Sequence, residues 1–345
     1  MRFKHFLNVA FLSLVLTGCN TTYYYSEFIQ PSEVYVPSKI YAVGVLNRGA
    51  SSQMATTIYT DGVPFEYIKG IPKKASAKTI EALKKDLEGL GRFKIVDIPW
   101  ERELRDQRKF LEDPLSAKEI DSLCENYKVA GIIALEGVDL TIRTDGDVNV
   151  VTVNDEMGMP MRVPEFSSRQ EASFTAAWRF YDGYSLSAID TYQETYQRFF
   201  NRVAYNPDDA ARVDADDMQL IDVVREASYD YYKRVSPHWV DGFRLYYKGG
   251  TAEMYTISEN LQYTGNWEQA AAGWLKLTTH DDYKIRQFAT FNMAVASEMM
   301  GRPKVAKEWL LKSIEIKSTK NTEKYLETLN RQIVVYEVVD QQLGI

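Results

Sequence analysis

The spacing of apolar positions changes several times along the chain, and each change predicts a different element. Nearly continuous apolar runs over residues 40–46, 93–98 and 129–135 predict three buried strands. Between the first two runs, apolar residues recur at helical spacing over 76–90, and Gly91 predicts the end of that helix. The chain therefore begins with alternating strands and helices, as in a mixed α/β sheet.

A capping box and an alternating pattern predict the next elements. Ser116 and Glu119 have the spacing of a capping box, which predicts a helix that begins there. Apolar and polar residues then alternate over 138–153. This pattern predicts a β-hairpin whose turn is formed by Asp145 and Gly146.

Further strands complete the predicted sheet domain. Strands are expected at 173–181 and 187–197, so that residues 39–204 form an α+β domain with a mixed α/β sheet. Residues 205–250 are expected to be a linker with connecting helices, among them a helix over 221–235.

The C-terminal part contains an internal repeat. Gly265 and Gly301 are thirty-six residues apart, and each is followed five positions later by a small residue, Ala270 or Ala306. This spacing resembles that of tetratricopeptide (TPR) repeats, in which small residues let paired helices approach closely. Residues 251–345 are therefore predicted to be an all-α, TPR-like domain.

The N-terminal residues have the organisation of an export signal. Arg2 and Lys4 form a positive region, and residues 6–16 form an apolar run that is too short to span a bilayer. Residues 16–19, Leu-Thr-Gly-Cys, follow and resemble a bacterial lipobox. Residues 1–18 are therefore predicted to be a signal peptide, and Cys19 the lipid attachment site, where acyl chains such as palmitate hold the protein on a membrane. An ordinary export signal with an incidental cysteine is the alternative.

Residues 19–38 are expected to be a tether between the lipid and the first domain. Its tyrosines at 23–25 could lie at the level of the lipid headgroups or pack on the fold. Asn20 follows the cysteine, where an aspartate would mark retention in the inner membrane. The expected location is the periplasmic face of an outer membrane, and the cell surface is the alternative.

The composition is that of a globular and acidic protein. The 345 residues carry a formal net charge of −7, with 26% charged and 45% hydrophobic residues, which is typical of folded domains. The acidic balance and the lack of a Lys/Arg tract argue against nucleic acid as a partner, because phosphates need a basic surface.

Residues for common catalytic chemistry are scarce. The chain has two cysteines and three histidines, and it lacks the motifs of serine hydrolases, P-loops, dinucleotide sites and zinc proteases. With Cys19 lipidated, Cys124 has no partner for a disulfide and is expected to be an inert, buried thiol. We therefore predict no enzyme activity, no cofactor and no metal site.

Three features allow both a functional and a structural interpretation. His238 could be a catalytic base or a packing imidazole, and His280, beside Asp281 and Asp282, could bind a metal or lie in a solvated loop. The five aspartates of 205–217 could bind calcium or could cap helices in a linker. The structural interpretation is favoured in each case.

Aromatic residues are concentrated over 229–247. They could stack on sugars or anchor a peptide. They could equally form the seam between the sheet domain and the helical repeats, and this second interpretation is favoured.

Three segments of the first domain resemble a known family. Residues 39–46, 90–96 and 129–137 follow the order seen in CsgG-like and TolB N-terminal-like domains, although Ala130-Gly131 departs from the "aD" of that pattern. The resemblance implies a periplasmic adaptor or assembly module that is not an enzyme.

A second resemblance extends over the whole chain. Residues 178–182, 189–190, 231–239 and 244–247 are similar to those of an uncharacterised family of Bacteroidota-type lipoproteins. This resemblance implies the two-part architecture and no established activity.

The sequence thus predicts an outer-membrane-anchored lipoprotein that acts as a protein-interaction or assembly module in the cell envelope. The membrane would be contacted through the N-terminal lipid, and an envelope protein through the TPR-like helices. A glycan- or small-ligand-binding lipoprotein that uses its aromatic surface is the alternative, and a hydrolase with an unrecognised carboxylate site is a third hypothesis.

Overall fold

The computed structural model divides the chain into two compact units. The helical unit comprises the described residues up to Gln30 together with Trp239–Val338, and the sheet unit comprises Pro31–His238 with Val339–Ile345. The structure describes residues 20–49, 55–60, 63–69, 71–100, 111, 113–211 and 218–345.

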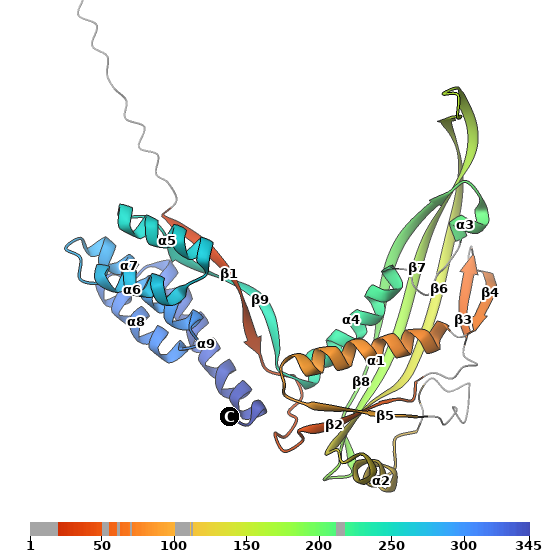
Figure 1. Ribbon diagram of the computed structural model, residues 1–345, viewed down its shortest axis with the longest axis horizontal. Coiled ribbons are helices and arrows are strands. Elements are labelled where there is room, and N and C mark those ends of the chain that lie inside the picture. Colours follow the sequence, from red (N-terminus) through yellow and green to blue (C-terminus); the bar gives the residue numbers. More distant parts are fainter. Residues whose placement is uncertain are drawn as a thin grey trace, which may run out of the picture. The chain divides into compact units, whose positions relative to one another are not determined.

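The sheet unit combines a mixed sheet with helices (Figure 1). Its strands are β2 (Ala42–Asn47), β3 (Ala55–Thr60), β4 (Val63–Lys69), β5 (Lys94–Ile98), β6 (Gly131–Asn154), β7 (Pro160–Asp182) and β8 (Ser187–Ala204). Its helices are α1 (Ile71–Gly89), α2 (Ala117–Tyr127), α3 (Pro207–Ala211) and α4 (Met218–Val235). The strands predicted at 40–46, 93–98 and 129–135 and the helix predicted at 76–90 are confirmed.

The long strand β6 organises the sheet. One edge of β6 pairs with β7 along its whole length in antiparallel fashion, and β7 pairs in turn with β8. The other edge pairs in parallel first with β2 and then with β3. The remaining strands, β5 and β4, pair with β2 and β3 respectively.

The two faces of the sheet are covered by different helices. On one face α1 and α4 lie side by side (Figure 1), and the ring of Tyr231 from α4 stacks on Trp178 of β7 with 4.8 Å between the centroids. On the other face Ile120 of α2 packs on Leu46 and Ile132. Side chains of this size each contribute about 2 kcal/mol when fully buried.

The predicted capping box is present at the start of α2. The Ser116 hydroxyl accepts a hydrogen bond from the Glu119 amide, and the Glu119 carboxylate accepts one from the Ser116 amide at 2.9 Å. These two bonds satisfy amides that the first turn of a helix leaves without partners.

The turn predicted at Asp145-Gly146 for the hairpin over 138–153 is wrong. Asp145 and Gly146 lie within β6, opposite Arg169 and Ser168 of β7. The chain reverses instead at Asp155, whose carboxylate accepts hydrogen bonds from the amides of residues 157 and 159, and at Gly158, which has a φ of +78°. An Asp-Gly pair is a local signal, and here the long ladder to β7 overrides it.

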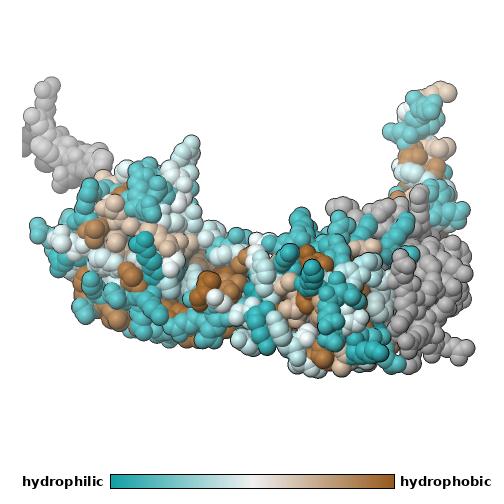
Figure 2. All heavy atoms as spheres, turned by 60° about the horizontal axis from the view of Figure 1, so that its bottom comes forward, coloured by the Kyte–Doolittle hydropathy of each residue, from teal (hydrophilic) through white to brown (hydrophobic). Residues whose placement is uncertain are grey.

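The end of this hairpin is a projecting arm, defined as residues 145–165. Among the described residues, β6 and β7 pair only with each other along the arm. Its exposed apolar side chains include Val148, Val150, Met157, Met159 and Met161, and Figure 2 shows hydrophobic and hydrophilic atoms together on it.

A ribbon of two strands belongs to the helical unit. Strand β1 (Thr21–Gln30) pairs with β9 (His238–Tyr247) in a sheet of its own among the described residues. Asn20 lies beside Lys248, and Phe28 lies beside Gly242, so the strands run in opposite directions. This differs from the tether expected at 19–38, because β1 is built into the unit by pairing with a strand that is distant in sequence.

The helices of this unit are α5 (Ala252–Thr264), α6 (Trp267–Leu277), α7 (Tyr283–Met299), α8 (Pro303–Ile316) and α9 (Lys320–Leu343). The last residues of α9, from Val339, are grouped with the sheet unit. The chain is thus a mixed α/β sheet region followed by a C-terminal helical region. Gly265 follows α5 and Gly301 follows α7, with φ of +64° and +74°, a conformation that favours glycine. The linker expected at 205–250 also differs from the structure, because α4 belongs to the sheet unit and β9 is a strand. No helix within the described ranges is long and apolar enough to cross a bilayer.

The position of the turn in the arm can be tested with two glycines. Gly158→Ala should destabilise the arm by about 1 kcal/mol, because a side chain is strained at positive φ. Amide hydrogen exchange of the arm should then become about fivefold faster. Gly146→Ala is the matched control, since an added Cβ meets no atom within 4 Å and the φ is not positive. Faster exchange in the control than in the Gly158 variant would contradict the assigned turn.

Candidate binding site

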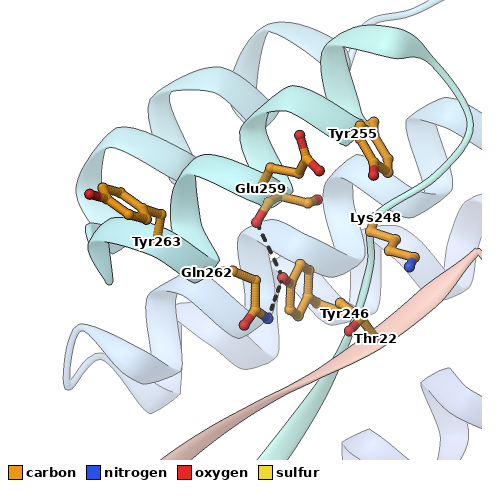
Figure 3. Close-up of a pocket in the computed structure, with 8 residues that line it drawn as sticks. Thr22, Tyr246, Lys248, Tyr255, Glu259, Gln262 and Tyr263 are labelled. Atoms are coloured by element: carbon orange, nitrogen blue, oxygen red, sulfur yellow. Dashed lines mark hydrogen bonds between the residues drawn. The ribbon is translucent and has the colours of Figure 1, made fainter.

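A cavity of about 410 Å³ opens in the helical unit between α5 and the ribbon (Figure 3). We call it the α5 cavity. Three of its residues, Tyr255, Glu259 and Tyr263, recur every four positions on α5, so they lie along one face of that helix. The full lining consists of Thr22, Tyr246, Lys248, Tyr255, Ser258, Glu259, Gln262 and Tyr263.

Helix α5 is fixed at both ends and along its inner face. The Thr251 hydroxyl accepts a hydrogen bond from the Met254 amide at the N-terminus, and Gly265 in the left-handed conformation ends the helix. Met254 and Leu261 are buried in the core of the unit. The polar residues on the other side of the helix are thereby held toward the cavity.

The floor of the cavity is the buried Tyr246 of β9. Its hydroxyl accepts a hydrogen bond from the Gln262 amide at 2.8 Å and donates one to the Ser258 carbonyl at 3.5 Å. Burial raises the pKa of Tyr246 above its usual value. The hydroxyl of Ser258 is also buried, and it has no hydrogen-bond partner among the described residues. Buried hydroxyls are normally paired, so this one is an exception in the wall of the cavity.

The rim carries charges of both signs and two tyrosines. Lys248 lies at the end of β9, and Glu259 lies on α5. The neighbouring Glu259 carboxylate raises the pKa of Tyr255 through a hydrogen bond and its negative charge. Tyr263 is 93% exposed. A cation, a carboxylate and phenol rings around one opening can bind a polar ligand that carries both charges.

The cavity lies beside the first residue that the structure describes. The Lys248 amide donates a hydrogen bond of 2.9 Å to the Asn20 carbonyl, and a Cβ on Gly249 would lie 2.6 Å from the Asn20 side chain. Cys19, the predicted lipid attachment site, lies outside the described residues but directly precedes Asn20 in sequence.

A buried ion pair fixes the ribbon on the helices. Arg244 of β9 donates two hydrogen bonds to Glu298 of α7, at 2.6 and 2.7 Å, and its guanidinium lies 3.9 Å from the ring centroid of Phe28. Tyr325 of α9 donates a third hydrogen bond to Glu298 at 2.7 Å. Burial and the Glu298 charge raise the pKa of Tyr325 well above its usual value.

The side chain of Asn292, on α7, pairs with the backbone of β9. Its side-chain oxygen accepts from the Tyr247 amide at 2.8 Å, and its side-chain nitrogen donates to the Tyr247 carbonyl at 2.6 Å. Asn292 is fully buried, so both bonds form away from water. These two hydrogen bonds therefore fix the backbone of Tyr247, the last residue of β9.

A second hollow, the α5–α6 groove, has a volume of about 330 Å³. Its accessible apolar surface includes Ile257, Ala272 and Gly273, and its polar residues include Asn260 and Gln269. Gly273 lets the two helices approach, because a Cβ there would lie 2.7 Å from the Ile257 side chain.

The cysteine and histidines singled out in the sequence have structural surroundings. Burial, with the charges of Asp121 and Asp182, raises the pKa of the Cys124 thiol to about 11, so the reactive thiolate is disfavoured. His238 is buried against Tyr232, and burial lowers its pKa. These surroundings agree with the structural interpretation of both residues.

His280 and the aspartate-rich segment lie apart from the two hollows. The ring of His280 accepts a hydrogen bond from the Asp282 amide at the start of α7. Within the described ranges, no group of three or more His, Cys, Asp or Glu residues is placed to hold a metal. Residues 212–217 of the aspartate-rich segment lie outside the described residues, while Asn206 accepts a hydrogen bond from the Asp209 amide at the start of α3.

The aromatic stretch over 229–247 is divided between the two units. Tyr231 and Tyr232 belong to the core of the sheet unit, and Tyr246 and Tyr247 belong to the core of the helical unit. Sequence reasoning included Tyr246 in this stretch but did not identify the other residues of the α5 cavity. The spacing of four positions between Tyr255, Glu259 and Tyr263 predicts that they share one face of a helix. It does not predict that β9 lies opposite that face.

Comparisons with known proteins identify the family. Residues 40–247, more than half of the chain, match the family described as "Domain of unknown function (DUF8603)", and the chain belongs to this family. Residues 256–331 match a second family, "Domain of unknown function (DUF6340)". No curated protein matches the chain.

Two solved structures have a distant similarity. The PelC dodecamer from Paraburkholderia phytofirmans is 9% identical, with 62% of this chain and 96% of that chain covered and a TM-score of 0.26. A protein described as a neuraminyllactose-binding hemagglutinin homolog from Helicobacter pylori is 10% identical, with coverages of 59% and 95% and a TM-score of 0.25. Similarity at this level carries no argument about fold or function. The resemblances to CsgG-like domains and to Bacteroidota-type lipoproteins stay predictions.

The importance of the ion pair on the ribbon can be measured directly. Glu298→Gln should lower the free energy of unfolding by about 3 kcal/mol, because Arg244 would keep its buried position without a counter-charge. Urea unfolding followed by tryptophan fluorescence measures this loss. Glu268→Gln, at an exposed position on α6, is the matched control and should change stability by less than about 0.5 kcal/mol. Equal effects of the two substitutions would contradict the assigned role.

The buried His238 should make stability depend on pH. Its pKa is lowered in the folded state, so the unfolded state binds the proton more readily. The contribution of His238 is therefore present above pH 6.5 and is lost as the pH falls through the folded-state pKa. Urea unfolding at pH 7.5 and 5.5 should show a smaller decrease for His238→Gln than for the unmodified protein. His280→Gln serves as the control, and the same decrease in all three proteins would contradict the prediction.

Proposed function

We propose that this protein is a lipoprotein, anchored through Cys19 to the periplasmic face of the outer membrane, that holds an envelope protein partner through its helical unit. The anchor is supported by the lipobox-like sequence over 16–19. Strand β1 begins two residues after Cys19 and pairs with β9. With this arrangement the lipid holds the helical unit directly and leaves no long tether.

The observation that carries the binding role is the α5–α6 groove. It combines a surface of Ile257, Ala272 and Gly273, which are at least partly exposed, with amide side chains at Asn260 and Gln269. Such a surface can bury the apolar side chains of a peptide while the amides pair with its backbone. We propose a binding role without catalysis, cofactor, metal or nucleic acid.

We further propose that the helices are TPR-like, with α5–α6 and α7–α8 as two repeated pairs. Equivalent positions thirty-six residues apart have similar surroundings. Ala270 and Ala306 are both buried, and so are Trp274 and Leu310. In this proposal α9 is the helix that covers the end of the array, since a repeat array needs a terminal element to close its core.

The binding role can be tested by site-specific photocrosslinking in intact cells. A crosslinking residue at Gln269, in the groove, should capture a discrete protein, and the same residue at Glu308, exposed on α8, should not. Asn260→Ala should reduce the yield at least threefold, since it removes an amide from the groove. Cys19→Ala should also reduce it, because the protein would leave the membrane. Equal capture from both positions, or none from Gln269, would overturn the proposal.

A glycan or small ligand is the second candidate, and the aromatic rim of the α5 cavity favours it. Tyr255 and Tyr263 present exposed rings beside Glu259. Tyrosine rings can stack on sugars while a carboxylate accepts their hydroxyl hydrogens. Saturation-transfer NMR with oligosaccharides would test this, and the absence of any transfer would remove the candidate.

A further inference from the structure

We infer that the α5 cavity binds the headgroup of a phospholipid that carries a primary ammonium, of the phosphatidylethanolamine type. The inference rests on the proposed lipid anchor at Cys19. It goes beyond that proposal because it assigns a specific headgroup site to the surface of the protein next to the anchor.

The position of the cavity is the first argument. Consecutive Cα atoms are 3.8 Å apart, so an acylated Cys19 would hold Asn20 within one residue of the lipid. The carbonyl of Asn20 accepts a hydrogen bond from the amide of Lys248, and Lys248 lines the cavity. Thr22, two residues further along β1, lines it as well. The anchor would therefore keep the opening of the cavity at the depth of the headgroups.

The charges on the rim are the second argument. A phosphoethanolamine group has an anionic phosphate and a cationic ammonium separated by two carbons. Lys248 provides the cation for the phosphate, and Glu259 provides the carboxylate for the ammonium. Lys248 directly follows β9, and Glu259 lies on α5 (Figure 3). A zwitterionic ligand has a group of opposite charge for each of these residues, whereas a purely anionic ligand has none for Glu259.

The neutral groups fit the same ligand. Tyr255 and Tyr263 are exposed on the face of α5 that borders the cavity, and tyrosine is a residue that favours the headgroup region of membranes. Their rings can also attract an ammonium group. Ser258 also lines the cavity, and its buried hydroxyl has no partner among the described residues. The ammonium and the phosphate of the headgroup thus each have a candidate partner on the rim.

Binding of a water-soluble phospholipid tests the inference. The full-length protein, purified in detergent from its membranes, would be titrated with dihexanoylphosphatidylethanolamine by calorimetry. Saturable binding is expected. The corresponding phosphatidylcholine and phosphatidylglycerol should bind about tenfold more weakly, because the first has no N–H donor and the second has no ammonium.

Two substitutions and two matched controls connect binding to the cavity. Lys248→Ala and Glu259→Gln should each weaken binding about tenfold, since each removes one charge from the rim. Lys284→Ala and Glu268→Gln, at exposed positions that do not line the cavity, should leave binding unchanged. Lack of saturable binding, or binding that is insensitive to both rim substitutions, would overturn the inference. Binding of an oligosaccharide in place of the phospholipid would overturn it in favour of a glycan site.

Mass spectrometry of the same preparation separates this inference from the proposed anchor. An acylated Cys19 together with binding of the phospholipid supports both. Acylation without binding overturns the headgroup site and leaves the anchor intact. An unmodified Cys19 overturns the anchor and, with it, the placement of the cavity at the membrane surface.

Discussion

The helical unit depends on the pairing of β1 with β9, because the residues of this ribbon complete a core that the helices alone leave open. Tyr247 stacks on Phe288 with 4.0 Å between the ring centroids, and Tyr246 lies against Trp274. The position of β9 is set by polar bonds that form away from water, chiefly those of Asn292 to the Tyr247 backbone. Such bonds tolerate little displacement, since a buried polar group without a partner is costly. Tyr246, the floor of the α5 cavity, therefore belongs to the core itself.

The local sequence pattern was sufficient to predict those helices and strands that are specified by their own residues. The capping box at Ser116 predicted the start of α2, and apolar spacing predicted α1 together with β2 and β5. The same reasoning missed β1 and β9, because a ribbon of two strands has no continuous apolar face and is specified by its partner in the distant chain. It also placed the hairpin turn at Asp145-Gly146, where a twenty-three-residue β7 keeps β6 extended.

The candidate sites were less predictable than the fold. The prediction of lipid attachment at Cys19 rests on sequence alone. The α5 cavity requires Tyr246 and Lys248 to face Tyr255, Glu259 and Gln262, and no spacing along the chain indicates that β9 lies opposite α5. Sequence reasoning drew attention to His238 and Cys124, which are rare residues in this chain. Sequence reasoning favoured structural roles for both residues, and their surroundings agree with this, since desolvation favours the neutral form of each.

The order of the ribbon strands along the chain has a consequence for folding. The Gln262 side chain donates a hydrogen bond to the Tyr23 carbonyl across 239 residues of sequence. Because a chain is synthesised from its N-terminus, β1 is made long before β9. The sheet unit, with its continuous β6–β7 hairpin, can fold in this interval. Contacts between segments so distant in sequence form slowly. Until β9 is available, the backbone groups along β1 have no strand partner. Immobilising residue 19 at a surface would restrict where that strand can diffuse, and would thereby favour its pairing with β9 over pairing with a neighbouring chain.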